Sequence, residues 1–239
     1  MSTLNILSGG AAQGLVASLT PTFKGHTRFD IAGEFGAVGV MADKLRKGTP
    51  ADIVILTAAL LAKLAEEKLV VAATISDVGL VETALAVRTG DPEPTVRDAA
   101  GLREVLLASD AIFVPDTKAS TAGIHVANVL DRLGIVDEIA SRLRIFPNGA
   151  TAMRELAASE ARRPIGCTQS TEIISTKGVS LSGSLPPGCE LATMYTAGIT
   201  GAAAHPQQAQ DLIDLLTGAG QQEQRQRAGF ISGRSQAPT

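Results

Sequence analysis

The segment Asp116–His125, with the sequence DTKASTAGIH, places hydroxyl groups directly before a predicted amphipathic helix. The first N–H groups of a helix have no partner within it, and the macrodipole adds partial positive charge at that end. A carboxylate or an oxyanion is therefore stabilised there without a dedicated cation. Ser120 and Thr121 can cap the helix or donate to a ligand, and an ordinary cap without a ligand is the alternative. The apolar stripe of this helix and its C-terminal stop are Ile124, Val126, Val129, Leu130, Leu133 and Gly134.

Small residues follow the first three predicted strands. Ser8, Gly9 and Gly10 come after the strand 4–7, residues 33–37 after the strand 27–32, and Thr57 and Ala58 after the strand 53–56. In open α/β sheets ligands bind outside the carboxyl ends of the strands, so these loops predict one wall of a ligand site. The first loop does not match a dinucleotide fingerprint, because the third glycine and the acidic residue of that pattern are out of place. A tight strand-to-helix turn is the alternative for it.

The composition narrows the class of ligand. The 239 residues carry a formal net charge of −3, with 19% charged and 3% aromatic residues and no Trp. No broad basic face is available for a nucleic acid, and base stacking or an aromatic sugar platform is disfavoured. No apolar run approaches the roughly 18 residues of a membrane span, so the protein is not expected to be membrane-embedded. A small polar ligand is favoured.

The sequence leaves the cellular location of the protein and the state of its two cysteines open. Met1 leads directly into a strand without a signal peptide, so we expect a periplasmic protein if a leader was removed and a cytoplasmic one if Met1 is the native start. Cys167 and Cys189 either form one disulfide or remain as two buried thiols, and they lack metal-ligand spacing. No metal site and no cofactor are expected.

The hydrophobic pattern predicts alternating strands and helices in two series, and therefore parallel sheets. Two extended segments, 80–87 and 191–199, connect the series as crossovers. The predicted fold is an α/β clamshell of two hinged lobes, each a mainly parallel sheet flanked by helices, with lobe I formed by residues 1–79 plus 192–239 and lobe II by residues 80–191. The remaining predicted elements are helices 14–23, 38–46, 58–67, 99–108, 150–159, 206–217 and 221–227 and strands 111–114, 144–146, 165–168 and 179–182, with a frayed tail over 234–239.

Several segments resemble the type II periplasmic solute-binding proteins, in the group similar to the molybdate-binding component of ABC importers. They are Lys47–Ile55, Ser120–His125 with Leu130–Ile135, Arg163–Gly166 and Ala228–Phe230. In physical terms, Gly48 belongs to a turn, Asp52 stands at a strand start, and Gly123 permits close approach of the backbone at the helix N-terminus. The resemblance implies a hinged cleft that holds a small anion, and an ABC permease as partner if the protein is exported.

The chain departs from the molybdate binders at the residues that would hold a tetrahedral oxyanion. In those proteins serines from the first two loops, backbone N–H groups of the second lobe and a tyrosine near the hinge bind the ligand. Here Ser8 is followed by Gly9, the second loop contains Gly36 and Ala37, and Gln169 stands where the tyrosine is expected. These departures favour an organic carboxylate over molybdate.

A related branch that includes aconitate isomerases resembles the chain more closely, through the segments 169–172 and Tyr195–Ile199. This resemblance implies an alternative function, a cofactor-independent allylic proton shift on a tricarboxylate. Glu34, His125 and Glu172 are the candidate bases. We expect Glu34 in a partly desolvated loop that raises its pKa, with a solvated loop carboxylate as the alternative. Binding is the favoured function, and whether the protein is also an enzyme stays open.

The predicted ligand-binding residues combine backbone N–H groups with a few orienting side chains. Lys118 would add a charge-assisted contact to a carboxylate, and otherwise lies in solvent. The full set is Ser8, Gly9, Gly10, Gly36, Ala37, Lys118, Ser120, Thr121, His125 and Gln169.

Overall fold

The computed structural model describes residues 2–231, and the predicted tail over 234–239 lies outside this range. The described chain divides into two compact units. The first contains residues 2–35, 41–81 and 193–231, and the second contains residues 36–40 and 82–192. Gly36–Val40, which the sequence assigns to lobe I, groups with the second unit.

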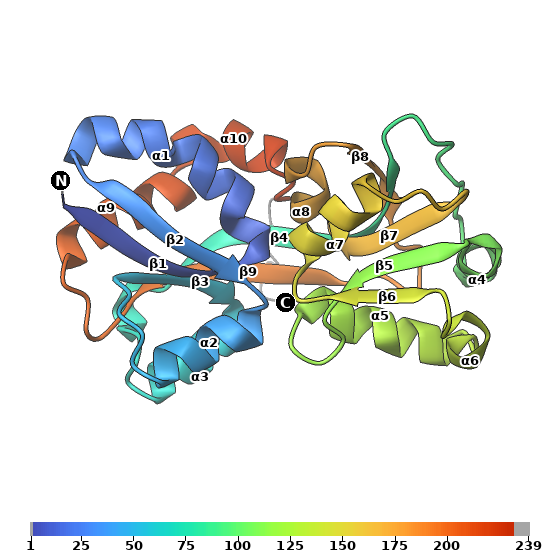
Figure 1. Cartoon of the computed structure of the whole chain (residues 1–239). Helices are drawn as coiled ribbons and strands as arrows, with labels where there is room; N and C mark the ends of the chain where they lie inside the picture. The colour runs from blue at the N-terminus through green and yellow to red at the C-terminus, as the bar shows by residue number, and fades with distance from the viewer. Residues whose placement is uncertain (1, 232–239) are drawn as a thin grey trace, which may run out of the picture. The chain divides into compact units, whose positions relative to one another are not determined.

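The first unit has the strand order β2-β1-β3-β9. Strand β1 is parallel to β3, and β3 is antiparallel to β9. Helix α1 covers one face of these strands, and α2 and α3 cover the other (Figure 1). The elements are β1 (Thr3–Gly9), η1 (Gly10–Ala12), α1 (Gln13–Thr27), β2 (Asp30–Gly36), α2 (Val38–Arg46), β3 (Ile53–Thr57), α3 (Ala58–Glu66), η2 (Ala72–Thr74), β9 (Ala192–Ile199), α9 (Pro206–Thr217), η3 (Ala219–Gln221) and α10 (Gln222–Arg227).

The second unit has the strand order β4-β7-β5-β6, and β8 also pairs with β4. Strand β5 is parallel to both β6 and β7, whereas β4 is antiparallel to β7 and β8. The elements are β4 (Ser76–Arg88), α4 (Ala99–Ala108), β5 (Ala111–Pro115), α5 (Thr121–Arg132), α6 (Val136–Ile139), β6 (Leu143–Phe146), α7 (Gly149–Ala157), β7 (Pro164–Gln169), α8 (Ser170–Ser175) and β8 (Val179–Ser184).

The strand pairing corrects the expectation of mainly parallel sheets. The two predicted crossovers are the strands β4 and β9, and both pair antiparallel with their neighbours in the units described above. The sheets are therefore mixed. Strand β2 was also misplaced, because it runs over Asp30–Gly36 rather than 27–32. Its glycines predicted a loop, but Gly33 and Gly36 lie within β2, which stands at the end of the strand order.

Strand β5 shows how the second unit builds its core. Its side chains alternate, so that Ile112 and Val114 join one apolar cluster and Ala111 and Phe113 join another. The first cluster includes the buried residues of α5, and the second includes those of α7. Helices α5 and α7 consequently lie on opposite faces of β5–β7 (Figure 1).

Asp52 fixes three separate segments of the first unit. It precedes β3, is 1% exposed, and its carboxylate accepts hydrogen bonds from the N–H groups of Asn5 (2.8 Å) and His205 (2.9 Å). Its own N–H donates to the Asn5 carbonyl at 2.8 Å.

The turn before β3 requires a glycine at position 48. Gly48 has a φ of +84°, and a residue with a side chain would be strained in this conformation. The predicted strand start and turn are confirmed.

We expect Asp52→Ala to lower the free energy of unfolding by about 2–4 kcal/mol, because two N–H groups lose their buried acceptor. Asp43→Ala, which removes an exposed carboxylate from α2, is the control and should change it by less than about 0.5 kcal/mol. Urea denaturation followed by circular dichroism measures both variants. Equal stabilities would contradict the role given to Asp52.

Candidate functional site

The predicted ligand residues of the second unit follow parallel strands at one sheet edge. Because β5, β6 and β7 are parallel, their carboxyl ends share an edge. Residues 116–120 follow β5, residues 147–148 follow β6, and α8 begins directly after β7. Lys118, Ser120, Thr121 and Gln169 therefore belong to the same edge. The sheet brings together residues 116–120 and Gln169, which are at least 49 positions apart along the chain.

The start of α5 has no side-chain cap. Ser120 is the N-cap residue and is buried, but its hydroxyl makes no capping hydrogen bond. Asp116 Oδ1 instead accepts from the N–H groups of Lys118 (2.7 Å) and Ala119 (2.9 Å) and fixes the preceding turn. The Asp116 carboxylate thus uses two amides of the loop itself, while the first amides of α5 receive no side-chain acceptor from Ser120. Ser120 therefore occupies the N-cap position without making the predicted capping hydrogen bond.

Gly123 lies in the first turn of α5, against the loop. A Cβ at this position would stand 2.1 Å from the Asp116 carbonyl oxygen. The predicted close approach of the backbone is confirmed.

His125 is held by a contact within its own unit. Its Nε2 lies 2.8 Å from the carbonyl oxygen of Cys189, and Arg132 donates to the carbonyl of Gly188 at 3.0 Å. Both contacts fix the segment after β8 against α5. The Nε2 atom of His125 is therefore engaged by the backbone, which weakens its case as a base. Lys118 is exposed.

Glu172 is the centre of a buried polar cluster at this edge. Its side chain is 5% exposed, and its Oε2 accepts a hydrogen bond from Thr168 Oγ1 at 2.6 Å. The backbone N–H groups of Ala150, Gln169 and Gly149 also donate to the carboxylate. Burial raises the pKa of Glu172, while these hydrogen bonds oppose the increase. The carboxylate thus occupies the N-terminus of α7.

Gly149 makes room for this carboxylate, which the sequence did not reveal. A Cβ on Gly149 would lie 1.9 Å from Glu172 Oε2 and 2.2 Å from Thr168 Oγ1. Asn148 caps the same helix, because its Oδ1 accepts from the Thr151 N–H at 2.8 Å. In the sequence, the pair Asn148-Gly149 before a predicted helix was the available sign of a special helix start. It could not identify the Glu172 carboxylate as the partner of Gly149, because Glu172 follows another strand, β7.

The first unit places Ser8 and its neighbouring glycines at the carboxyl end of β1. Ser8 is fully buried, and its hydroxyl donates to the Gly9 carbonyl at 2.8 Å. Gly9 and Gly10 are buried and lead into η1. Gly36 and Ala37, also buried, belong to the second unit, where the Gly39 N–H donates to the Ala119 carbonyl at 3.3 Å.

Glu34 corrects a prediction about the candidate bases. It lies within β2 rather than in a loop, its side chain is 47% exposed, and it forms an ion pair with Lys44 of α2. The expected desolvated pocket is therefore wrong for this carboxylate, because β2 continues to Gly36 and leaves Glu34 facing solvent and Lys44. Glu34 is therefore a solvated carboxylate, as the alternative held, but it lies on a strand and not in a loop.

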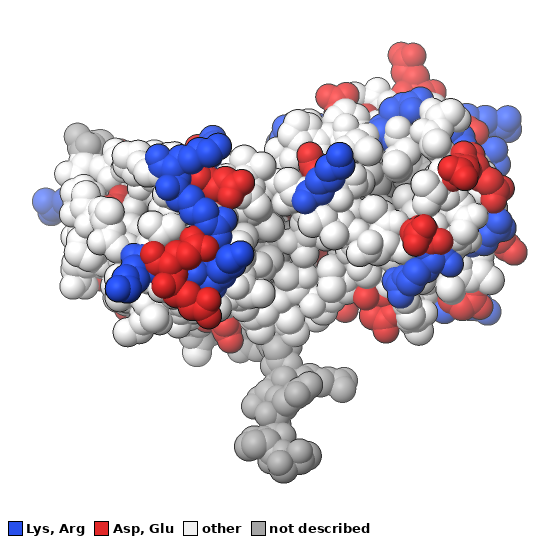
Figure 2. Space-filling model, turned by 90° about the horizontal axis from the view of Figure 1, so that it is seen from below, with Lys and Arg blue, Asp and Glu red and all other residues white. Residues whose placement is uncertain are grey.

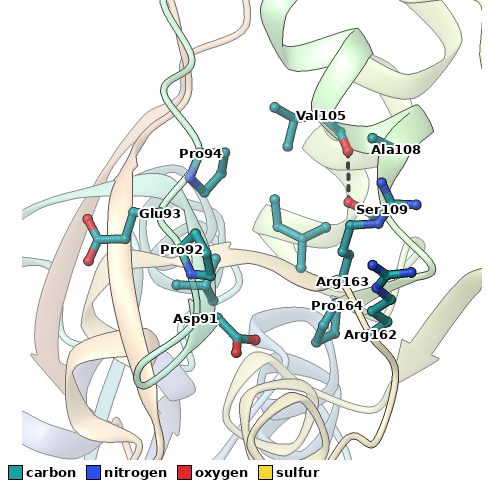
Figure 3. Close-up of a pocket in the computed structure, with 12 residues that line it drawn as sticks. Asp91, Pro92, Glu93, Pro94, Val105, Ala108, Ser109, Arg162, Arg163 and Pro164 are labelled. Atoms are coloured by element: carbon teal, nitrogen blue, oxygen red, sulfur yellow. Dashed lines mark hydrogen bonds between the residues drawn. The ribbon is translucent and has the colours of Figure 1, made fainter.

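A separate pocket of about 300 Å³ lies in the second unit between the 91–94 segment and α4. In Figure 3 Pro92, Glu93 and Pro94 line one side, and Arg162, Arg163 and Ser109 line the other. Ser109 donates to the Val105 carbonyl at 2.8 Å. None of the predicted ligand residues lines this pocket.

The surface charges are mixed in sign on the face that is drawn. On the face shown in Figure 2, basic and acidic side chains are intermingled within each unit.

Cys167 and Cys189 are free and buried. Burial raises the pKa of the Cys167 thiol to about 12, so this thiol stays protonated. Within residues 2–231, no three His, Cys, Asp or Glu side chains are placed to hold a metal ion. No helix in this range is long and apolar enough to cross a membrane.

Residues 4–231 match the model of a family described as bacterial extracellular solute-binding protein. The chain belongs to this family. Among curated proteins, an aconitate isomerase from Pseudomonas sp. is 24% identical over 223 residues, which are 90% of this chain and 82% of the relative.

Solved structures show that this solute-binding protein shares the type II periplasmic-binding fold. The periplasmic molybdate-binding protein of Azotobacter vinelandii matches with a TM-score of 0.79 at 18% identity, over 97% of this chain and all of the other. The sulfate-binding protein SubI of Mycobacterium tuberculosis H37Rv matches with a TM-score of 0.75 at 16% identity, over 98% and 88%. The resemblance to molybdate-binding-like proteins is therefore confirmed at the level of fold.

We expect Gly123→Ala to destabilise this solute-binding protein by about 1–3 kcal/mol, because the added methyl group overlaps the Asp116 carbonyl. Gly101→Ala is the matched control, since Gly101 is also the third residue of its helix but a Cβ there meets only Asp98 Oδ1 at 3.4 Å. The control should be neutral or up to about 1 kcal/mol more stable. Urea denaturation of both variants tests the close approach, and equal effects would argue against it.

The raised pKa of Glu172 predicts a pH-dependent stability. Between the ordinary value of 4.5 and the raised folded value, the folded protein retains a proton that the unfolded chain has lost. The contribution of Glu172 to stability is therefore complete below about pH 4.5 and declines as pH rises through this window. The stability of the wild type relative to Glu172→Gln should fall over the same range, as measured by denaturation at several pH values. Glu190→Gln controls for the loss of one exposed carboxyl, and a pH-independent difference would contradict the prediction.

Proposed function

We propose that this protein captures a small organic anion, with a carboxylate favoured over molybdate or another inorganic oxyanion, as a solute-binding protein of ABC import. The observation that carries the proposal is the uncapped start of α5 at the same sheet edge as Gln169. Free helix amides with neighbouring polar side chains are a suitable site for an anion. The hinged cleft, the permease partner and export belong to this proposal through the resemblance to the family.

The kinds of buried side chain support recognition by neutral donors. The buried polar residues of the described chain are Ser, Thr, Gln, Asp and Glu, with no Lys, Arg or His among them. Hydroxyl, amide and backbone N–H groups can bind a carboxylate and fix its orientation without a buried cation.

Two features work against a tetrahedral inorganic oxyanion. Gly36 and Ala37 supply no hydroxyls at the second loop. The amides at the start of α7 are already used by the Glu172 carboxylate. Fewer donors remain for an ion that needs contacts on every side, which favours an extended organic acid with separate carboxylates.

An aconitate-isomerase-like activity is the second candidate, favoured by the relative that aligns with 90% of the chain. Such a reaction removes a proton from one end of an allylic system and returns one at the other end, without a cofactor. Of the three candidate bases, Glu34 is exposed and paired and His125 contacts the backbone. Glu172, with its raised pKa, is the base that this alternative requires.

A ligand screen tests both candidates. We expect citrate, trans-aconitate or a related acid to raise the melting temperature, because a ligand at 100 times its Kd adds about 2.7 kcal/mol of stability. Circular dichroism is the suitable signal, since the chain has one Tyr and no Trp. Molybdate, sulfate and phosphate complete the panel.

Each hit is then incubated with the protein and followed by NMR. An unchanged carboxylate supports the binding protein, and its conversion to an isomer supports the enzyme. A response to molybdate alone would contradict the preference for a carboxylate.

A further inference from the structure

The pocket between the 91–94 segment and α4 lies where the pairing of two strands of the second unit ends. Residues 83–86 of β4 pair with residues 166–169 of β7. Strand β4 continues to Arg88 and β7 begins at Pro164, so each strand extends two residues beyond this paired stretch. Proline has no N–H group with which to continue the hydrogen bonds between strands. The pocket lies beside these two strand ends.

The interior of the pocket is largely apolar. Val87 and Ile165 line it from the strand ends, Val105 from α4, and Pro92 and Pro94 from the opposite side. Its volume of about 300 Å³ is at the small end of the range for ligand pockets in proteins. The apolar chain or ring of a small molecule would be removed from water here, which favours its binding.

The two acidic side chains that line the pocket leave room for an anion. Asp91 is neutralised by an ion pair with Arg88, whose Nε donates to Asp91 Oδ2 at 2.8 Å. In Figure 3 the carboxylate of Glu93 points away from the arginines on the opposite side of the pocket. Repulsion of a carboxylate bound near those arginines is therefore small.

Arg162 supplies a cation without a partner. Its side chain is exposed, and within residues 2–231 it makes no ion pair or hydrogen bond. Arg163, on the same side of the pocket, already contacts the Asp110 carboxylate at 3.4 Å. A guanidinium group binds a carboxylate through two parallel N–H donors, so Arg162 is suited to hold one acid group at the rim of the apolar interior.

We propose that this pocket is a second ligand site, which binds a small monocarboxylate with an apolar chain or ring. Arg162 holds the carboxylate, and the apolar part lies against Val87, Val105 and Ile165. A single acid group is specified, because further carboxylates would enter the apolar interior. The site is at the amino end of β7, whereas the edge in the proposed function is at its carboxyl end, so this inference does not depend on that function.

Three probes with the same six-carbon chain test the ligand class: hexanoate, hexan-1-ol and hexylammonium. Titrations followed by ligand-observed NMR should give hexanoate a Kd at least threefold lower than that of either other probe. Arg162→Gln should raise the Kd of hexanoate at least threefold and leave that of hexan-1-ol unchanged. Arg97→Gln is the matched control, because Arg97 is also exposed but does not line the pocket, and it should change neither Kd.

A second pair of variants tests the location of the apolar chain. Ala108 lies at the end of α4 and lines the pocket, so Ala108→Phe should fill it and raise the Kd of both hexanoate and hexan-1-ol at least fivefold. Ala100→Phe is the control on the same helix, because Ala100 is exposed and lies outside the pocket lining. Circular dichroism melting curves verify that each variant is folded.

The outcomes separate this inference from the proposed function. Absence of saturable hexanoate binding, or equal Kd values for hexanoate and hexylammonium, overturns the inference. Hexanoate binding that is unchanged in Arg162→Gln and Ala108→Phe places the acid elsewhere and also overturns it. Binding of trans-aconitate tests the proposed function independently. Its Kd should be the same in the wild type and in both pocket variants, and a change would contradict two separate sites.

Discussion

A buried carboxylate that accepts hydrogen bonds from backbone N–H groups joins distant segments in each unit. In the first unit Asp52 binds the amides of Asn5 and His205. In the second unit Glu172 binds the amides at the start of α7 and of Gln169, together with Thr168. A buried acid is unfavourable unless several donors compensate for its lost hydration. Each carboxylate therefore imposes the positions of its donors, and these positions carry the neighbouring loops.

The Glu172 interaction also determines which helix start can serve a ligand. Helices α5 and α7 both follow parallel strands and begin at the same edge. The amides of α7 are satisfied by an internal acid and by the Asn148 cap, whereas Ser120 does not cap α5. The chain thus supplies its own carboxyl acceptor at one helix and leaves the other to water or ligand. Gly149 is essential to this arrangement, since any side chain there would overlap the carboxylate.

Local signals predicted much of the fold, and long-range contacts account for most of the rest. Helices α4 and α9 match their predicted limits, because an Asp cap precedes the first and Pro206 begins the second. Helix α8 was missed because six residues give no clear period. The setting of Glu34 depends on Lys44, ten residues away, and that of Glu172 depends on a glycine of another element. Sequence spacing indicated the sheet edge of the candidate site, but it could not show which donors are already used.

The same hydrogen bonds weigh against the isomerase and in favour of the binding protein. To act as a base, Glu172 must exchange a proton with the ligand and so release some of its donors. Hydrogen bonds to a charged group are each worth about 1.5–3 kcal/mol, and the amides of Gly149 and Ala150 would lose their acceptor. A binding protein makes no such demand, because Glu172 can keep every contact while hydroxyl and amide groups face the ligand. The raised pKa of Glu172 is then a consequence of its burial in a structural cluster, and catalysis would require the cluster to open.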